Sequence, residues 1–101
     1  MKPIELHADA AEEVRESIAF VGSVGEEAGE EFETALEAAL KLIARQPKAF
    51  SPYRTHYRRY VLTQYGYLIF YEELDDRVLV YAVTHGSRRP DHWLNRTPHE
   101  D

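Results

Sequence analysis

The stretch Arg58–Pro90, RRYVLTQYGYLIFYEELDDRVLVYAVTHGSRRP, decides the fold. It predicts three consecutive strands joined by two short turns at residues 65–66 and 75–76, where turn-forming residues interrupt the apolar runs. The middle run YLIFY (67–71) and the last run VLVYAV (78–83) are almost continuously apolar or aromatic. A strand with one wet face alternates between polar and apolar residues, so these runs indicate cover on both faces.

The source of that cover is only partly predictable. Helices from the first half of the chain can cover one face of the sheet, but little chain remains for the other face. Two interpretations of the second face fit the sequence equally. Either a partner protein covers it, or its tyrosines and small residues tolerate a half-wet surface.

The first half of the chain predicts a short strand and a helix. Residues Pro3–His7 alternate between apolar and polar side chains, as a strand does. Apolar residues then recur at three- and four-residue spacing across Ala8–Gly22, which predicts an amphipathic helix with a stripe of Ala11, Val14, Ile18 and Val21. We expect its opposite, solvated face to carry Glu12, Glu13, Arg15 and Glu16.

A second helix is predicted directly after the first. Ser23 and Glu26 have the spacing of a capping box, so we expect this helix to cover Val24–Arg45, before Pro47 stops it. The short link between the helices predicts an antiparallel hairpin. The acidic run at residues 26–33 contains no histidine and complements the helix dipole, so it predicts a solvated face and no metal site.

These elements together predict the fold class α+β, with the order β-α-α-β-β-β. We expect two layers, in which the helical hairpin packs on one face of a mainly antiparallel four-stranded sheet. Residues 48–56 are expected to form a loop, and residues 91–95 a short helical turn. The 101 residues fit a single domain, 1–101, with a frayed tail at 97–101.

Composition narrows the classes of function. The net charge is −6, and it is uneven: residues 1–50 hold five Lys and Arg against eleven Asp and Glu, whereas residues 51–101 hold seven against seven. An acidic body argues against a general nucleic-acid binder, because phosphate neutralisation supplies most of that affinity. Without cysteine there is no disulfide framework and no thiolate site. Neither a signal peptide nor a run of transmembrane length is evident, so we expect a cytoplasmic protein with no membrane contact and no cofactor.

The chain resembles the RelE/ParE superfamily of toxins from type II toxin–antitoxin modules. The resemblance spans nearly the whole chain and rests on the helical hairpin, the closing proline, the YLIFY strand and the terminal pattern V-x-H-G-x-R-x-P. The matching residues are Pro47, Arg59, Tyr67 to Tyr71, Val83, His85, Gly86, Arg89 and Pro90. It implies a cognate antitoxin that wraps the toxin, and we expect Tyr67, Ile69, Tyr71 and Tyr81 to contact it.

The superfamily implies two mechanisms. A ParE-like toxin binds and inhibits DNA gyrase, whereas a RelE-like toxin cleaves mRNA on the ribosome. This sequence is more similar to the ParE-like, plasmid-stabilisation branch, because its strands contain no lysine and its charge is unsuited to ribosomal RNA. A ribonuclease and a non-toxic member of the superfamily remain the alternatives.

Each candidate site residue has a structural interpretation beside the functional one. Target contacts are expected from Arg59, Arg88 and Arg89, which are equally suited to salt bridges within the chain. His85 fits a general acid or base, or a hydrogen bond that fixes the turn after the last strand. His92, before a Trp93 that we expect to anchor the tail, is the other proton-transfer candidate together with Tyr57. If the protein is a ribonuclease, its catalytic residues are expected to be His85, Arg59, Arg89 and His92.

Overall fold

The computed structural model describes residues 1–98 and confirms the two-layer α+β fold. Its sheet has the strand order β1-β5-β4-β3-β2, in which β1 is parallel to β5 and the remaining neighbours are antiparallel. The elements are β1 (Ile4–Leu6), α1 (Ala8–Gly22), α2 (Glu26–Arg45), β2 (Ser51–Tyr53), β3 (Tyr57–Leu62), β4 (Tyr67–Glu73) and β5 (Val78–His85). Of the tail predicted to fray, residues 99–101 lie outside the described part. Within residues 1–98, neither helix is long and apolar enough to span a membrane.

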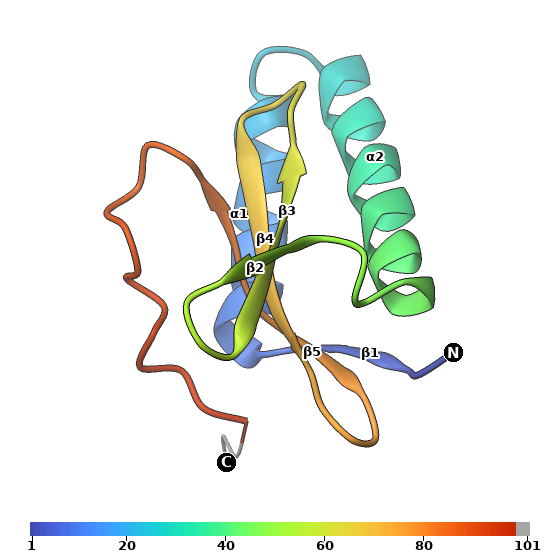
Figure 1. Ribbon diagram of the computed structural model, residues 1–101. Coiled ribbons are helices and arrows are strands. Elements are labelled where there is room, and N and C mark those ends of the chain that lie inside the picture. The colour runs from blue at the N-terminus through green and yellow to red at the C-terminus, as the bar shows by residue number, and fades with distance from the viewer. Residues whose placement is uncertain (99–101) are drawn as a thin grey trace.

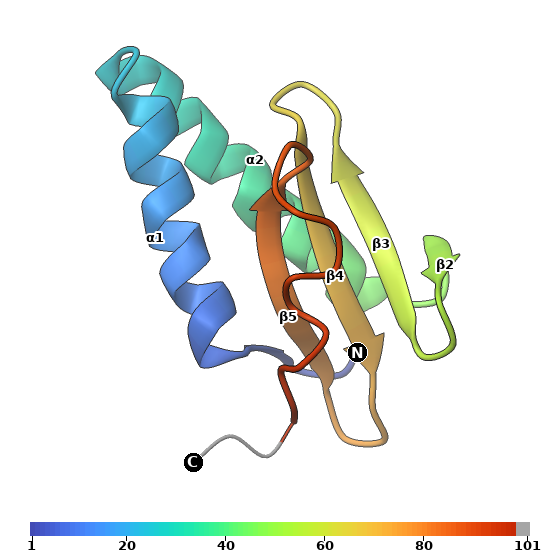
Figure 2. The ribbon, with the colours of Figure 1, turned by 90° about the vertical axis from the view of Figure 1, so that its left-hand side faces the viewer.

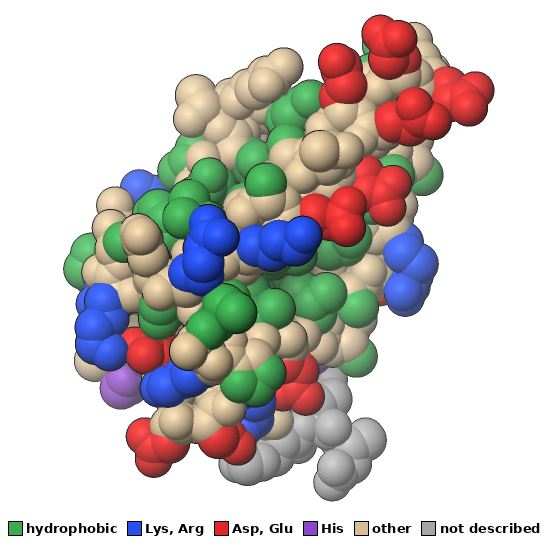
Figure 3. Space-filling view, turned by 90° about the vertical axis from the view of Figure 1, so that its right-hand side faces the viewer, with side chains coloured by type: hydrophobic (Ala, Val, Ile, Leu, Met, Phe, Trp, Pro, Cys, Tyr) green, Lys and Arg blue, Asp and Glu red, His purple; other side chains and the backbone are tan. Residues whose placement is uncertain are grey.

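The two helices form the expected antiparallel hairpin on one face of the sheet (Figure 1). They come close together at two glycines, Gly22 and Gly29. A Cβ atom on Gly29 would lie 2.9 Å from the Cα atom of Gly22, so any larger residue at position 29 would force the helix backbones apart. On the outer side of this layer, acidic side chains gather at one end, at the top of Figure 3.

The predicted start of α2 is wrong by two residues. The helix begins at Glu26, and its N-cap is Gly25, which provides no side-chain cap. Ser23 instead closes α1, because its backbone N–H and its hydroxyl both donate to the carbonyl of Phe20, the hydroxyl at 2.6 Å. The residue that the capping-box pattern assigned to the second helix therefore ends the first one.

The helix-facing side of the sheet carries the main core. Tyr67, Ile69 and Tyr71 of β4 point to this side and are almost completely buried. They pack with apolar side chains of α2, including Phe32, whose ring centroid lies 5.1 Å from that of Tyr67. Burial raises the pKa of Tyr71 to about 12, and its hydroxyl donates to the carbonyl of Pro47.

The opposite face of the sheet is covered by the chain itself, which answers the question left open by the sequence. Residues 86–98 turn back after β5 and run across the sheet on the side away from the helices (Figures 1 and 2). Trp93 is 1% exposed, as expected for a tail anchor, and its ring stacks on Phe70 at 4.7 Å between centroids. Tyr81 is buried beneath the same indole ring. A single tryptophan thus provides much of the cover that we had considered assigning to a partner.

The predicted loop at residues 48–56 contains a fifth strand. In β2, the residues Ser51–Tyr53 pair with Tyr57–Arg59 of β3. The hairpin is closed by Arg54, which adopts a positive φ of 52°. Pro52 is compatible with this position because β2 is an edge strand. The strand was not predicted because three residues that include a proline show no apolar alternation.

Candidate functional site

A small pocket lies where the chain leaves β5 and turns back over the sheet. Its volume is about 200 Å³, and residues from β2, β3, β4, β5 and the returning segment line it. Arg59 reaches it because this residue lies opposite Phe70 in the β3–β4 pair, on the face that residues 86–98 cover. The lining residues are Tyr53, Arg59, Leu68, Phe70, Thr84, His85, Gly86, Arg88, Arg89, Pro90, Asp91, His92 and Trp93.

All three arginines predicted to contact a target line this one pocket. Arg88 and Arg89 are exposed, and Arg59 is half-buried with its guanidinium carbon 5.9 Å from the ring centroid of Tyr53. In the described part of the chain, none of the three forms an ion pair with a carboxylate. The alternative interpretation, in which these arginines form salt bridges within the chain, is therefore not observed for residues 1–98. This is unexpected in a protein with six more acidic than basic residues.

The carboxylate that lines this pocket already accepts hydrogen bonds within the chain. Asp91 accepts hydrogen bonds from Arg54 and from the hydroxyl of Tyr53, the latter at 2.6 Å. The hydrogen bond from Arg54 is the main cause that lowers the pKa of Asp91, and that from Tyr53 adds to it. The charge of Asp91 is therefore matched by Arg54, and within residues 1–98 no carboxylate pairs with the three arginines of the pocket.

His85 has the geometry of a residue that fixes a turn. Its Nδ1 accepts the backbone N–H of Ser87 at 3.1 Å and lies 2.8 Å from the hydroxyl of the same residue. Its ring packs edge-on against Tyr67, with 5.2 Å between the centroids. Gly66 lies directly against the ring, since a Cβ atom there would be 3.0 Å from Nε2. One ring nitrogen is thus used for the turn, and the absence of a side chain at Gly66 leaves room for the other.

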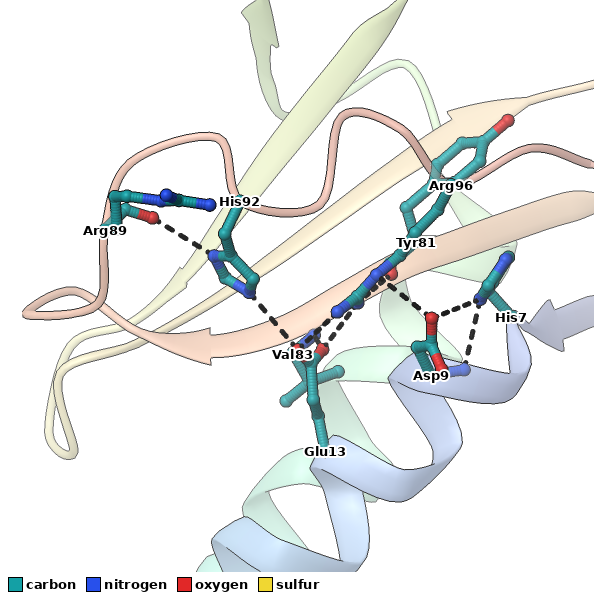
Figure 4. A network of polar contacts seen from close by, with 8 residues as sticks. All are labelled: His7, Asp9, Glu13, Tyr81, Val83, Arg89, His92 and Arg96. Carbon is teal, nitrogen blue, oxygen red and sulfur yellow. Dashed lines mark hydrogen bonds and ion pairs between the residues drawn. The ribbon is translucent and has the colours of Figure 1, made fainter.

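His92 lines the pocket, but both of its ring nitrogens contact groups of the chain. Nδ1 is 3.1 Å from the carbonyl oxygen of Arg89, and Nε2 is 3.3 Å from Oε2 of Glu13 (Figure 4). Both partners are acceptors, so both contacts are hydrogen bonds only when each ring nitrogen carries a proton. The ring is therefore held between the returning segment and α1.

Glu13 is the centre of the polar network that holds the returning segment in place (Figure 4). We expected this side chain on the solvated face of α1, but it is only 8% exposed. Arg96 donates to both carboxylate oxygens, at 3.0 and 2.9 Å, and also to the carbonyl of Tyr81 at 2.8 Å. The backbone N–H of Val83 donates to Glu13 at 3.0 Å, beyond the point where the short β1 stops pairing with β5. The prediction failed because the compensating charge lies 83 residues away in the sequence.

The charge state of Glu13 follows from these contacts. Burial by itself raises the pKa of this carboxyl group, but the hydrogen bonds from Arg96 and Val83 and the charge of Arg96 together hold it below its ordinary value. The carboxylate is therefore ionised at neutral pH and forms a buried ion pair with Arg96. Removal of only one partner of such a pair destabilises the fold, because the other charge then lies buried without a compensating charge.

The remaining candidates do not join the pocket as reactive groups. Tyr57 packs edge-on against Trp93 and Tyr81, with ring centroids 4.9 and 5.4 Å apart, and it does not line the pocket. Four residues expected at the antitoxin interface, Tyr67, Ile69, Tyr71 and Tyr81, are each at most 7% exposed within this chain alone. They do not form a surface in this conformation. Large apolar side chains are exposed elsewhere, at Phe20, Val24 and Val61.

The described residues contain no group of three or more His, Asp or Glu side chains arranged to hold a metal ion.

The sequence analysis did not identify the contributions of Tyr53, Thr84 and Arg96 to this region. Tyr53 lies in the strand that was not predicted, and Thr84 lies inside β5, where a threonine is an ordinary strand residue. Arg96 occurs in a tail that shows no periodic pattern.

A helical hairpin on one face of a mainly antiparallel sheet, with a pocket lined by three arginines beside the end of the last strand, defines a small α+β protein. The family model for the ParE toxin of the type II toxin–antitoxin system, parDE, matches residues 4–90, so the chain belongs to this family. It is also similar to proteins named Toxin ParE2 from two strains of Mycobacterium tuberculosis, at 34% identity over 56 residues in each case. That match spans 55% of this chain and 53% of each relative, about half their length.

Proposed function

We propose that this protein is the toxin of a type II toxin–antitoxin module and that it inhibits its target by binding. The family match and the name Toxin ParE2 of the similar proteins support the toxin assignment. DNA gyrase is the proposed target, as the ParE-like character of the chain implies, and this places the protein in the cytoplasm. Arg59, Arg88 and Arg89 are the proposed target contacts. The observation that carries the proposal is that the guanidinium groups of three arginines line one pocket and form no ion pair with a carboxylate of residues 1–98.

The inventory of proton-transfer groups favours binding over RNA cleavage. Cleavage through a 2′-hydroxyl requires a base, an acid and stabilisation of the charge that develops on the phosphorane. The arginines meet only the last requirement. Nδ1 of His85 and both ring nitrogens of His92 contact groups of the chain, and Tyr57 is packed away from the pocket.

The proposed antitoxin requires a surface other than the one predicted from the sequence. Phe20, Val24 and Val61 are 68%, 83% and 45% exposed. Burial of apolar area of this kind supplies the driving force of most protein association. We therefore propose that the cognate antitoxin covers part of this exposed apolar surface, and that expression without it inhibits growth.

Expression of matched variants tests the mechanism in cells. Wild type, Arg89→Ala and His85→Ala are expressed without antitoxin, and growth, transcript integrity and plasmid supercoiling are followed over time. Arg15→Ala is the matched control, since Arg15 is an exposed arginine paired only with Glu12 on α1. The proposal predicts intact transcripts, reduced supercoiling, and loss of both toxicity and reduced supercoiling in Arg89→Ala alone.

Two other outcomes would contradict the proposal. Rapid mRNA cleavage that disappears in His85→Ala would identify a ribonuclease of the RelE-like kind. Normal growth at a level of wild-type protein confirmed by immunoblot would identify a non-toxic member of the family.

A further inference from the structure

The pocket at the end of β5 holds an unusual set of hydrogen-bond donors. In the described part of the chain, few buried side-chain nitrogen or oxygen atoms lack a hydrogen-bond partner, and three of them belong to residues that line this pocket. They are Nε of Arg59, Oγ1 of Thr84 and Nε1 of Trp93. Thr84 and Trp93 are 5% and 1% exposed. Buried polar groups in folded proteins are nearly always paired, so three such atoms at one place call for an explanation.

The chemistry of these three atoms defines the kind of hydrogen-bond partner that they lack. The N–H groups of arginine and tryptophan donate only, and a threonine hydroxyl is also able to donate. Arg88 and Arg89 add two further cations at the rim. The one carboxylate of the lining, Asp91, already accepts from Tyr53 and Arg54. The pocket thus offers donors and positive charge without a matching acceptor.

We propose that this pocket binds a carboxylate group from an acidic segment of a partner protein. The inference rests on the proposed function, because it assigns a chemical class to the group that the target presents to the arginines. A carboxylate accepts through two coplanar oxygens and matches the planar fork of a guanidinium group. It would supply the acceptors that Arg59, Thr84 and Trp93 lack.

The surroundings favour a protein carboxylate over nucleic acid. Affinity for nucleic acid grows with the number of phosphates that are neutralised, and three clustered cations form no track along a phosphate backbone. The whole protein carries a net charge of −6, which repels a polyanion. The pocket is also lined by Leu68, Phe70 and Tyr53, which suit an apolar residue beside the carboxylate in a peptide.

Entry of the carboxylate requires only the exposed part of the lining to move. The three unpaired donor atoms have almost no solvent-accessible surface in this conformation, so a ligand oxygen must displace a covering side chain to reach them. Residues 86–90 are all exposed, and Gly86, Arg88, Arg89 and Pro90 among them line the pocket. We therefore expect the ligand to shift these residues, while Trp93 and the Glu13 network stay in place.

Titration of the full chain with defined peptides tests the inference. Trp93 is the single tryptophan, so its indole N–H gives one assignable NMR signal, and the Nε–H of Arg59 is a second reporter. The probe is the blocked tetrapeptide acetyl-Leu-Glu-Glu-Leu-amide, and its control is the same peptide with glutamine in place of glutamate. Inorganic phosphate and a single-stranded RNA tetramer are the competing ligands.

The acidic peptide is expected to shift both signals to a saturating value, and the glutamine peptide is expected to shift neither. Arg89→Gln should weaken binding about tenfold or more, the effect of losing one charge-assisted contact. Arg88→Gln is a second variant at an exposed position, and Arg15→Gln should bind as the wild type does. Thermal unfolding of each variant shows that it is folded.

The inference is overturned if the acidic peptide shifts neither signal, or if the glutamine peptide shifts them equally. It is also overturned if phosphate or RNA binds more tightly than the acidic peptide. Its failure is distinguishable from that of the proposed function. Peptide binding with full toxicity in Arg89→Ala would refute the proposed role of the pocket at the target, whereas toxicity that needs Arg89 without peptide binding would refute the carboxylate ligand.

Discussion

Replacing Arg96 with alanine should strongly destabilise the fold, although this residue lies in an irregular segment near the C-terminus. The substitution removes two hydrogen bonds to Glu13 and one to the carbonyl of Tyr81. The Glu13 carboxylate, whose side chain is 9% exposed, is left with the N–H of Val83 and the ring of His92. An uncompensated buried charge of this kind costs about 3–5 kcal/mol. Because Val83 and His92 still contact Glu13, we expect the free energy of unfolding to fall by about 3 kcal/mol, at the low end of this range.

Chemical denaturation followed by circular dichroism measures this loss directly. A change of about 3 kcal/mol corresponds to a fall in Tm on the order of 12–24 °C for a domain of this size. The matched control is Arg15→Ala, which breaks the exposed ion pair with Glu12 and should change stability by less than about 1 kcal/mol. The double variant Glu13→Gln/Arg96→Met removes both charges and should recover much of the stability.

The reasoning would be refuted if Arg96→Ala and Arg15→Ala unfolded at the same denaturant concentration. It would also be refuted if the loss of unfolding free energy in the double variant equalled the sum of the losses in the two single variants, because the two residues would then act independently. Either result would mean that the segment after β5 is not held by this network.

Three further predictions follow from burial and geometry. Because the folded pKa of Glu13 is lowered, its contribution to stability is present above its ordinary value of 4.5 and is lost as the pH falls through the lower folded value. Unfolding free energies measured between neutral and acidic pH should fall less steeply for Glu13→Gln than for the wild type, and equal slopes would contradict this. Trp93→Ala should lower the free energy of unfolding by about 3–5 kcal/mol, because a fully buried indole leaves a cavity on the sheet; a loss below about 1 kcal/mol in urea denaturation would show that the segment does not cover the sheet in solution. Gly29→Ala should lower the free energy of unfolding by about 1–3 kcal/mol, because its Cβ would lie 2.9 Å from the Cα of Gly22, and unchanged stability in urea denaturation would contradict this close approach.

The sheet and helices were predictable because their signals are local. Continuous apolar runs identified β4 and β5 as strands covered on both faces, and both are buried on both faces. The three- and four-residue spacing located both helices, and the short link between them predicted their antiparallel packing. The missed strand β2 contains Pro52 in only three residues, which is too short to show alternation.

The burial of Glu13 was not predictable from helical periodicity. The pattern of α1 assigned this carboxylate to the solvated face, and only a partner from the end of the chain makes its burial tolerable. The same long-range contact positions Trp93, which covers the sheet face that we had considered leaving to a partner protein. Information of this kind lies in the pairing of distant residues and is absent from any short window of sequence.

The pocket was predictable in its charged residues and not in its neutral ones. Arg59, Arg88 and Arg89 were selected because guanidinium groups bind phosphate and carboxylate anions bidentately. The structure brings all three to one pocket. Nothing in the sequence marked Thr84 as a pocket residue, because an inward-facing threonine in a strand usually has a hydrogen-bond partner in its surroundings.

The most direct test of the central claim is the supercoiling of relaxed plasmid by purified DNA gyrase in the presence of the purified protein. Wild type, Arg89→Ala and His85→Ala are compared at increasing concentration, with Arg15→Ala as the control. We predict that wild type, Arg15→Ala and His85→Ala inhibit supercoiling alike, and that Arg89→Ala requires at least about tenfold more protein. Equal inhibition by Arg89→Ala, or no inhibition by the wild type at any concentration, would contradict the assignment of the arginine pocket as the contact site on gyrase.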